Sequence, residues 1–442
     1  MKASSRSVLA IAAVLTSLML VVLDASIVNV ALPTLARDLN VSPASAMLIV
    51  TAYQAGLVMA LLPCAALGES LGHRRIFIGG VALFTLASGF CALAPSLTCL
   101  VMARLAQGLG AAAVMSLGVA LLRTVVPANR LGVAIGWNAL VVALTSAAGP
   151  TVGALVLALA SWPWLFAINL PLGLVVLAAA SALPPAPGVA RRLDRVNMAL
   201  TASTFGLLIG GAELFVRAPG IALGVLAVGA LGLATLIRRE ASHAAPLFPL
   251  DLLRAPSFRR SVIASVCCFI GQGAGLVALP FYLQHSLGLS PLTAGLHMTP
   301  WPLMAAVSAT LAGRMAKPSS TALLCTTGCA LLSAGLFAAS AWPLAKAPAA
   351  IMPIVMLCGL GFGLFQVTNN RNMFLSAPIE RSGAAGGLQS LARLSGQTAG
   401  VVVMTLLFSR LALDTAPRVG LALGALLTLA AGLLSATRVV RG

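Results

Sequence analysis

Long apolar stretches, interrupted by short charged or proline-rich segments, make up most of this chain. An α-helix needs about 20 mainly apolar residues to cross the hydrocarbon core of a bilayer. Fourteen stretches approach or exceed this length, at residues 8–30, 45–67, 76–94, 97–121, 131–157, 162–182, 196–216, 219–237, 260–283, 291–313, 320–342, 347–369, 384–408 and 418–437. A membrane β-barrel would instead show segments of about 10 residues with alternating polarity. The pattern therefore predicts an all-α membrane protein with 14 transmembrane helices.

A short sequence pattern occurs twice and divides the chain. Residues 31–33 and 39–46 (ALP, then LNVSPASA) recur as residues 278–280 and 287–294 (ALP, then LGLSPLTA). In each copy a Ser-Pro pair, at Ser42 and Ser290, suits the start of a helix. The copies lie 248 residues apart (287 − 39), whereas six spans with short loops occupy about 190 residues. The surplus indicates one inserted pair of helices.

The inserted pair corresponds to the apolar runs 196–216 and 219–237, which two polar linkers flank at residues 183–195 and 238–260. We therefore expect an N-terminal six-helix bundle at residues 1–182, linkers and two inserted helices at 183–258, and a C-terminal six-helix bundle at 259–442. An even number of spans separates the two copies of the repeat, so the two bundles are expected to be parallel.

The chain carries a formal net charge of +18 and 27 Lys and Arg residues, a balance that can indicate nucleic-acid binding. Twenty of these residues fall at one face of the predicted bundle, and five fall at the other: Arg37, Arg217, Lys346, Arg410 and Arg418. Basic residues gather on the cytoplasmic side of membrane proteins. The charge therefore predicts the topology, with both termini in the cytoplasm. The expected partner is the lipid bilayer, and no nucleic-acid partner is expected. The first run is too long for a signal peptide and is interpreted as an uncleaved helix.

Composition and motifs argue against catalysis. Only 8% of the residues are charged, whereas soluble domains carry about 25%, so a water-soluble globule is excluded. Only nine residues are acidic. The sequence contains no P-loop or HExxH motif, and its eight cysteines lack metal-site spacing with histidines. We therefore expect no enzymatic activity, no cofactor, no metal site and no ATP-driven transport within this chain.

A lone acidic residue, Asp24, lies inside the first apolar run. A carboxylate at bilayer depth costs at least about 2.5–3.5 kcal/mol, and such residues commonly mark ion, proton or substrate pathways. At 1.5 Å per residue, Asp24 lies about 25 Å along the first helix, counted from its start near Ser7. Arg104 lies about 10 Å inward from the external end of the fourth helix. Both therefore lie at a similar level in a core roughly 30 Å thick. We predict that Asp24 couples protons or contacts cations and that Arg104 modulates it; a structural ion pair is the alternative.

Other polar side chains in the predicted helices are candidates for substrate contact or for hydrogen bonds between helices. Those on helices expected to border a central cavity are Tyr53, Gln54, Trp137, Asn138, Gln272, Gln366, Asn369 and Gln397. His297 either titrates near neutral pH or packs as a neutral side chain. Glu213 lies on the inserted seventh span, either at the depth of Asp24 or at the external surface near Arg217. Arg393 is expected to extend toward the cytoplasm.

Five segments also carry recognisable motifs: residues 23–33 (LDASIVNVALP), 104–112 (RLAQGLGAA), 148–153 (AGPTVG), 162–173 (WPWLFAINLPLG) and 380–400. Their order resembles the fourteen-span drug:proton antiporters of the major facilitator superfamily. The resemblance adds Asn29 and Gln107 to the candidate site. It implies a monomer that exports hydrophobic or cationic small molecules, such as drugs and antiseptics, across the cytoplasmic (inner) membrane in exchange for protons. Export of a single endogenous metabolite and a non-transporting membrane sensor are the alternatives.

The resemblance also implies residues that gate transport. In the loop at residues 65–75 (AALGESLGHRR), Glu69, Gly72, Arg74 and Arg75 match a cytoplasmic latch motif, but Ala65 and Ser70 depart from it. The latch is therefore expected to be weaker or differently paired. Gly149, Pro150 and Gly153 predict a kink or hinge in the fifth helix near the external gate, because proline removes a backbone hydrogen bond. Arg393 belongs to the motif of the thirteenth helix.

Overall fold

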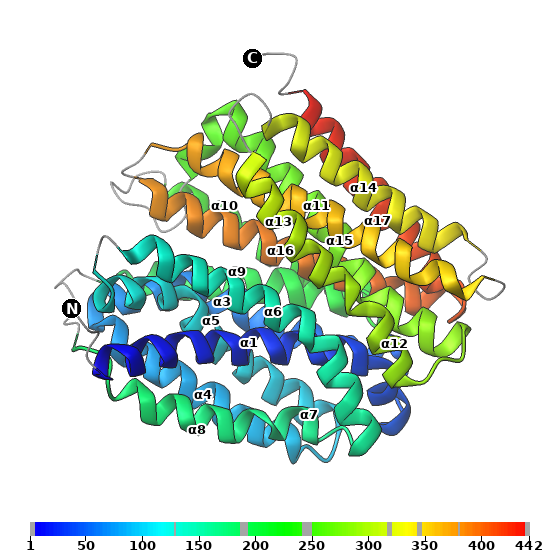
Figure 1. Ribbon diagram of the computed structural model, residues 1–442, viewed down its shortest axis with the longest axis horizontal. Helices are drawn as coiled ribbons and strands as arrows, with labels where there is room; N and C mark the ends of the chain where they lie inside the picture. The colour runs from blue at the N-terminus through cyan, green and yellow to red at the C-terminus, as the bar shows by residue number, and fades with distance from the viewer. Residues whose placement is uncertain are drawn as a thin grey trace. The chain divides into compact units, whose positions relative to one another are not determined.

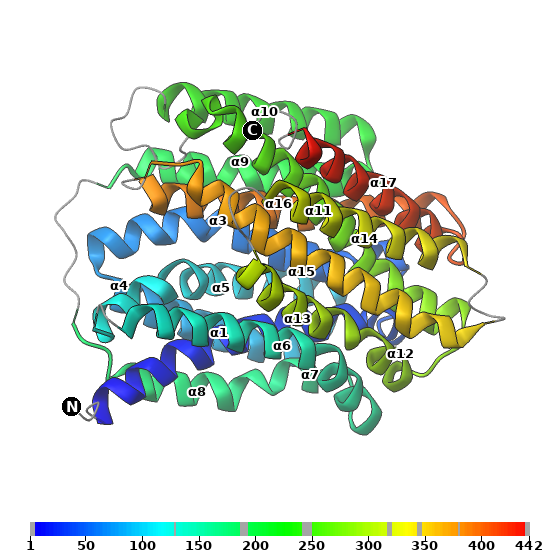
Figure 2. The ribbon, with the colours of Figure 1, turned by 45° about the horizontal axis from the view of Figure 1, so that its top comes forward.

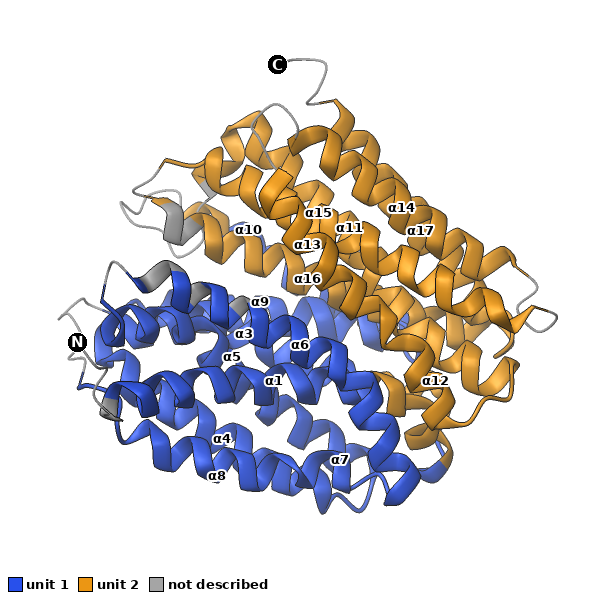
Figure 3. Ribbon diagram, in the orientation of Figure 1, with its two compact units in different colours: residues 1–28, 38–41, 48–236 blue, residues 29–37, 42–47, 237–442 orange. Residues whose placement is uncertain are grey.

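The structure, a computed structural model, describes residues 5–127, 130–185, 193–240, 250–315, 321–342, 347–378 and 381–437. The described elements are helices, and the chain divides into two compact units (Figures 1 and 3). Several residues used above lie outside the described ranges, namely linker residues 186–192 and 241–249, Glu380, Lys2, Arg191, Arg192, Lys317, Lys346, Arg438 and Arg441.

Unit 1 comprises residues 1–28, 38–41 and 48–236. Its elements are most of α1 (Ser5–Asp38), α3 (Leu48–Leu71), α4 (His73–Ala92), α5 (Leu97–Val125), α6 (Leu131–Leu159), α7 (Trp164–Ala167), α8 (Asn169–Ala180), α9 (Arg195–Leu214) and most of α10 (Pro219–Glu240). Helix α5 packs against α3 and α4, and α9 packs against α3 (Figure 2). Helices α9 and α10 correspond to the predicted inserted pair.

Unit 2 comprises residues 29–37, 42–47 and 237–442. Its elements are α2 (Pro43–Ala46), η2 (Leu250–Arg254), α11 (Pro256–Phe281), η3 (Tyr282–Ser286), α12 (Pro291–Met298), α13 (Pro300–Met315), α14 (Thr321–Ala341), η4 (Pro348–Ala350), α15 (Ile351–Leu375), α16 (Ser382–Arg410) and α17 (Ala416–Ala436). Helix α11 packs against α16 and α17, and α15 packs against α13 and α14.

Eleven helices in the described residues are long and apolar enough to cross a membrane. They account for eleven of the fourteen predicted runs. Two other runs are divided by helix breaks: 162–182 forms α7 and α8, and 291–313 forms α12 and α13. Prolines explain both breaks, because Pro171 and Pro300 have no N–H to donate to the carbonyl four residues earlier. The remaining run, 196–216, forms the continuous helix α9, which is not among the eleven.

The two predicted Ser-Pro helix starts are confirmed. Ser42 Oγ accepts a hydrogen bond from Ser45 N at 3.1 Å, and Ser290 Oγ accepts one from Thr293 N at 3.2 Å. In each case the serine caps the helix and the following proline occupies its first turn. The serine side chain satisfies one backbone N–H at the start of the helix. The proline lacks an N–H, but in the first turn that group would have no partner within the helix.

Close backbone contact sets the position of α5 in unit 1. A Cβ atom added at Gly108 would overlap Tyr53 O on α3, and one added at Gly56 would overlap Leu105 O on α5. Small residues of this kind let helices approach closely within a bilayer. The contact holds the segment that carries Arg104 and Gln107 against the segment of α3 that carries Tyr53.

Candidate functional site: a buried carboxylate in unit 1

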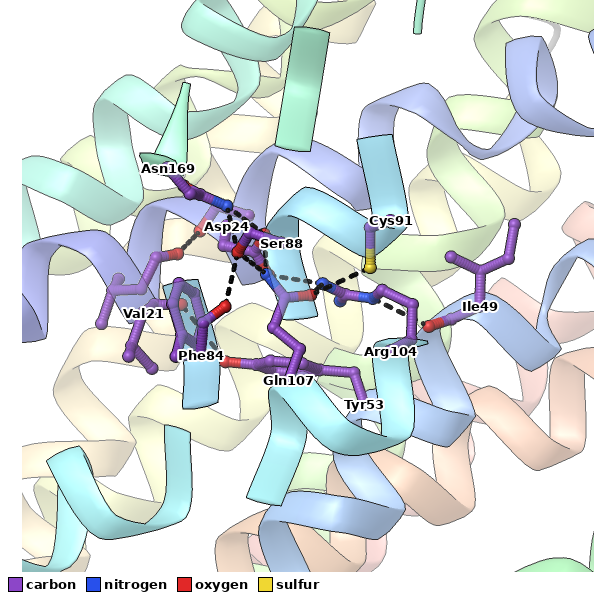
Figure 4. Close-up of polar contacts among 12 residues, drawn as sticks. Val21, Asp24, Ile49, Tyr53, Phe84, Ser88, Cys91, Arg104, Gln107 and Asn169 are labelled. Atoms are coloured by element: carbon purple, nitrogen blue, oxygen red, sulfur yellow. Dashed lines mark hydrogen bonds and ion pairs between the residues drawn. The ribbon is translucent and has the colours of Figure 1, made fainter. Parts of the chain in front are cut away.

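Asp24 and Arg104 form an ion pair in the interior of unit 1. Arg104 Nη1 donates to Asp24 Oδ2 at 2.5 Å, and the two side chains are 1% and 0% exposed, respectively. Figure 4 shows the pair and its polar neighbours. The predicted partnership between these residues is therefore present in the structure. Its function as a proton-coupling pair stays a prediction.

Two amide side chains complete the hydrogen bonds of the carboxylate. Gln107 Nε2 and Asn169 Nδ2 donate to Asp24 Oδ1 at 2.9 and 2.8 Å (Figure 4). The same two nitrogens lie 2.8 and 3.4 Å from Ser88 Oγ, which donates to Phe84 O. Asp24, Ser88, Arg104, Gln107 and Asn169 are called the Asp24 cluster below.

Arg104 has further partners that fix its guanidinium. Its Nη1 donates to Gln107 Oε1 at 2.6 Å, and its Nε donates to Ile49 O at 3.2 Å. Its charged carbon lies 4.2 Å from the ring centre of Tyr53 and 5.6 Å from that of Phe166. Tyr53 in turn donates to Val21 O at 3.4 Å. The aromatic rings add cation–π attraction to the ion pair.

Four helices of unit 1, α1, α4, α5 and α8, build the cluster. Asp24 lies on α1, Ser88 on α4, and Arg104 and Gln107 lie one turn apart on α5. Asn169 is the first residue of α8, directly after the break at Ile168 that Pro171 explains. Asn169 and Ser88 were missed in the sequence analysis. A polar residue within the motif at residues 162–173 was the available signal for Asn169, whereas a lone serine in an apolar helix gives no such signal for Ser88.

The remaining candidate residues make no hydrogen bond to the Asp24 cluster among the described interactions. In unit 2, Gln397 Nε2 donates to Gln272 Oε1 at 3.1 Å, and Asn369 Nδ2 donates to Ser261 O at 3.1 Å. His297 Nδ1 lies 2.7 Å from Thr293 O, within its own helix. Asn29, Asn138 and Gln366 are half-buried and also lie outside the cluster.

Arg393 lies on α16, in unit 2. Its Nη1 donates to Gln397 Oε1 at 3.5 Å, one turn further along α16 and away from the cytoplasmic start predicted for that span. The amide of Gln397 gives the guanidinium a partner on its own helix, and the predicted extension of Arg393 toward the cytoplasm stays a prediction.

The predicted gating residues of unit 1 occupy two places. Gly72 has a φ of 99° before α4, a conformation that favours glycine, and Arg74 Nη2 donates to Ser181 O at 3.1 Å. Glu69 and Arg75 flank this turn. Gly149, Pro150 and Gly153 lie in α6, which is continuous from Leu131 to Leu159. The predicted latch and hinge stay predictions.

Comparisons with known proteins identify the family. Residues 14–401 match the family model described as the Major Facilitator Superfamily. The chain is 42% identical over 438 residues to the uncharacterised transporter YebQ of Escherichia coli, covering 98% of this chain and 95% of YebQ. It is 30% identical over 414 residues to the tetracenomycin C resistance and export protein of Streptomyces glaucescens, covering 92% and 76% of the two chains.

Two further similarities extend the comparison. The riboflavin transporter RibZ of Clostridioides difficile is 29% identical over 378 residues, covering 84% of this chain and 81% of RibZ. The crystal structure of a D-xylose–proton symporter aligns with a TM-score of 0.70 at 15% identity, covering 97% and 96% of the two chains, which supports the fold alone. The predicted family resemblance is confirmed, and these relatives show a multi-pass membrane transporter and not an enzyme. The chain belongs to the major facilitator superfamily.

Proposed function

We propose that this transporter is a proton-coupled antiporter that exports hydrophobic or cationic small molecules across the cytoplasmic (inner) membrane. In this proposal it has 14 transmembrane helices, as two six-helix bundles and one inserted pair, with both termini cytoplasmic. It works as a monomer by alternating access, driven by the proton motive force. The similarity to a drug export protein of Streptomyces supports the substrate class. The Asp24–Arg104 pair, closed off from solvent, is the observation that carries the coupling.

The charge of the Asp24 cluster explains how protons and cations would compete. With Asp24 ionised, its charge and that of Arg104 cancel. With Asp24 protonated, the cluster carries one positive charge. A monovalent cation about 10 Å away would then be repelled by about 1.7 kcal/mol at an effective dielectric constant of about 20, which lowers its affinity about 15-fold.

The competition is reciprocal. If protonation weakens cation binding by a given factor, cation binding weakens protonation by the same factor. A cation arriving from the cytoplasm would therefore favour the ionised cluster, and a proton arriving from outside would favour release of the cation. This scheme needs no direct contact between the cation and Asp24, whose carboxylate already accepts hydrogen bonds from Arg104, Gln107 and Asn169.

The test is a panel of lipophilic cations and neutral compounds in inverted membrane vesicles with an imposed proton gradient. Wild-type vesicles should accumulate substrate against its gradient, and dissipating the proton gradient should abolish accumulation. Asp24→Asn should remove uphill accumulation while downhill exchange of substrate continues. Uphill accumulation at the wild-type level in Asp24→Asn vesicles would refute the proposed coupling.

Export of one endogenous metabolite is the second candidate, and the similarity to a riboflavin transporter favours it. The same panel separates the two functions. A multidrug exporter should accept chemically unrelated lipophilic compounds with similar efficiency, whereas a metabolite exporter should accept one chemical class and discriminate against the rest.

A further inference from the structure

Within the Asp24 cluster, Asn169 carries a buried oxygen for which the described residues supply no hydrogen-bond partner. Its Nδ2 donates to Asp24 Oδ1, but its buried Oδ1 has no hydrogen-bond partner among the described residues. The side chain is 0% exposed. An orphaned acceptor in an apolar interior costs about 1–3 kcal/mol, so its retention beside a titratable carboxylate calls for an explanation.

The ionised and protonated forms of Asp24 need different neighbours. The three hydrogen-bonding neighbours of its carboxylate among the described residues, Arg104 Nη1, Gln107 Nε2 and Asn169 Nδ2, are all donors. They suit a carboxylate, which only accepts hydrogen bonds. A neutral carboxylic acid also carries an O–H donor, and this arrangement offers it no acceptor. One of the three neighbours must therefore change when a proton binds.

Arg104 and Gln107 cannot supply that acceptor. A guanidinium has donors only. The amide of Gln107 is held at both ends, because its Oε1 accepts from Arg104 Nη1 at 2.6 Å and its Nε2 donates to both Asp24 and Ser88. Turning this amide over would place its NH₂ group against an arginine donor. It would also place its oxygen against Ser88 Oγ, which already donates to Phe84 O.

Turning over Asn169 costs less, although its NH₂ group then takes the place where Oδ1 had no partner among the described residues. Rotation of its amide by about 180° about χ2 exchanges oxygen and nitrogen, a torsion that is broad and roughly two-fold. The rotation gives up the bond to Asp24 and a long 3.4 Å contact with Ser88 Oγ. It brings Asn169 Oδ1, which has no partner to lose, to the position that Nδ2 held beside Asp24 Oδ1.

We infer that Asn169 is the positioning residue for protonation of Asp24, and that its side-chain amide turns over each time the carboxyl group gains or loses its proton. The inference rests on the proposed function, in which Asp24 carries the proton. A proton from water binds Asp24 Oδ1 on the side that faces Asn169 and is donated to Asn169 Oδ1. The bonds from Gln107 to Asp24 Oδ1 and from Arg104 to Asp24 Oδ2 remain in place.

The charged and titratable groups around Asp24 are consistent with this assignment. Helix α5 contributes Arg104, helix α3 contributes the Tyr53 ring that lies on the guanidinium, and helix α4 contributes Cys91, whose Sγ donates to Gln107 Oε1 at 3.7 Å. Helix α8 contributes only the neutral amide of Asn169. The side of the carboxylate that Asn169 occupies is therefore the side on which a proton meets no cationic neighbour.

Infrared difference spectroscopy of the full-length protein in lipid tests the inference directly. The protein is labelled with side-chain ¹³C-carbonyl asparagine, and spectra are compared between low and high pH. The carbonyl stretch of Asn169 should move to lower wavenumber when Asp24 is protonated, because its oxygen gains a hydrogen bond. The band is assigned by its loss in Asn169→Leu, or in Asn169→Ser if the leucine variant does not fold. Asn369, a buried asparagine bonded to Ser261 O in unit 2, is the internal control and should not shift.

The outcomes separate this inference from the proposed function. A carboxylic acid band that Asp24→Asn removes shows that Asp24 titrates, and absence of such a band would overturn the proposed function. If that band is present but the Asn169 carbonyl stretch does not move, the turnover of Asn169 is wrong. In Asn169→Leu the carboxylic acid band should move to higher wavenumber, since its O–H has lost its acceptor. An unchanged band there would also overturn the inference.

Discussion

The strongest energetic prediction concerns removal of one member of the buried ion pair. Replacing Arg104 by methionine keeps an unbranched side chain in the space but leaves Asp24 with two neutral amide donors. Breaking a buried pair by removing one partner costs about 3–5 kcal/mol, because the other charge is left uncompensated. Asp24→Asn should cost a similar amount, since it leaves the Arg104 guanidinium, 1% exposed, without its counterion.

The double variant, Asp24→Asn with Arg104→Met, contains neither charge. Independent effects would sum to about 6–10 kcal/mol, twice the cost of one broken pair. We expect the double variant to lose no more stability than either single variant. The contacts of Arg104 with Ile49 O and the Tyr53 ring are absent from both variants that lack Arg104, so they cancel in the double-mutant cycle. The remaining coupling energy, at least about 3 kcal/mol, belongs to the buried pair.

The assay is reversible unfolding in mixed detergent and SDS micelles, followed by circular dichroism. Asp414→Asn is the matched control, because Asp414 is 72% exposed and its removal should cost less than about 1 kcal/mol. A double variant whose loss equals the sum of the single losses to within about 0.5 kcal/mol would show that the two charges do not stabilise each other. The electrostatic basis of the proposed coupling would then be wrong.

Three further predictions test the surroundings of the cluster. Gly108→Ala should push α5 from Tyr53 O, lowering both stability and uphill transport, whereas Gly79→Ala on α4, where an added Cβ meets nothing within 4 Å, should leave both intact in the same assays. Thr51→Val removes the 2.7 Å hydrogen bond to Glu213 Oε1 and should lower the unfolding free energy by about 1–3 kcal/mol. Glu213→Gln keeps an oxygen acceptor and should lower it by less. Equal losses of unfolding free energy in the two variants would contradict this prediction. Pro150→Ala should raise the unfolding free energy and slow transport turnover at unchanged substrate affinity. Turnover and affinity are measured by vesicle transport, and faster turnover in the variant would exclude a hinge at Pro150.

Hydropathy predicted the helices well but not their interruptions. An average over about 20 residues does not register a single proline, so the runs that contain Pro171 and Pro300 read as uninterrupted spans and are broken in the structure. The predicted inserted helix near 196–216 is α9. Glu213, on that helix, is 8% exposed and bonded to Thr51 on α3, so it is buried within unit 1.

The level of a residue in the membrane could be predicted, but the direction of its side chain could not. Counting 1.5 Å per residue correctly placed Asp24 and Arg104 within reach of each other. It gives no rotation about the helix axis, which decides whether a polar side chain meets a neighbouring helix or its own backbone. His297, bonded to Thr293 O in its own helix, and Asn169, which reaches Asp24 across 145 positions, illustrate the two outcomes.

The packing around Asp24 relates the predicted hinge to the carboxylate. Helix α6 meets α1 at two glycines: an added Cβ at Gly149 would overlap Ser26, and one at Gly153 would lie 3.0 Å from Ile27 O. Pro150 lies between these contacts, and Ser26 and Ile27 lie two and three residues after Asp24. A bend of α6 at Pro150 would therefore act on the turn of α1 that follows the carboxylate. Since Asp24 is 0% exposed, protons can reach it only when its surroundings move. The α1–α6 contact is therefore a place where the predicted hinge motion and access to the proposed proton site would be the same event.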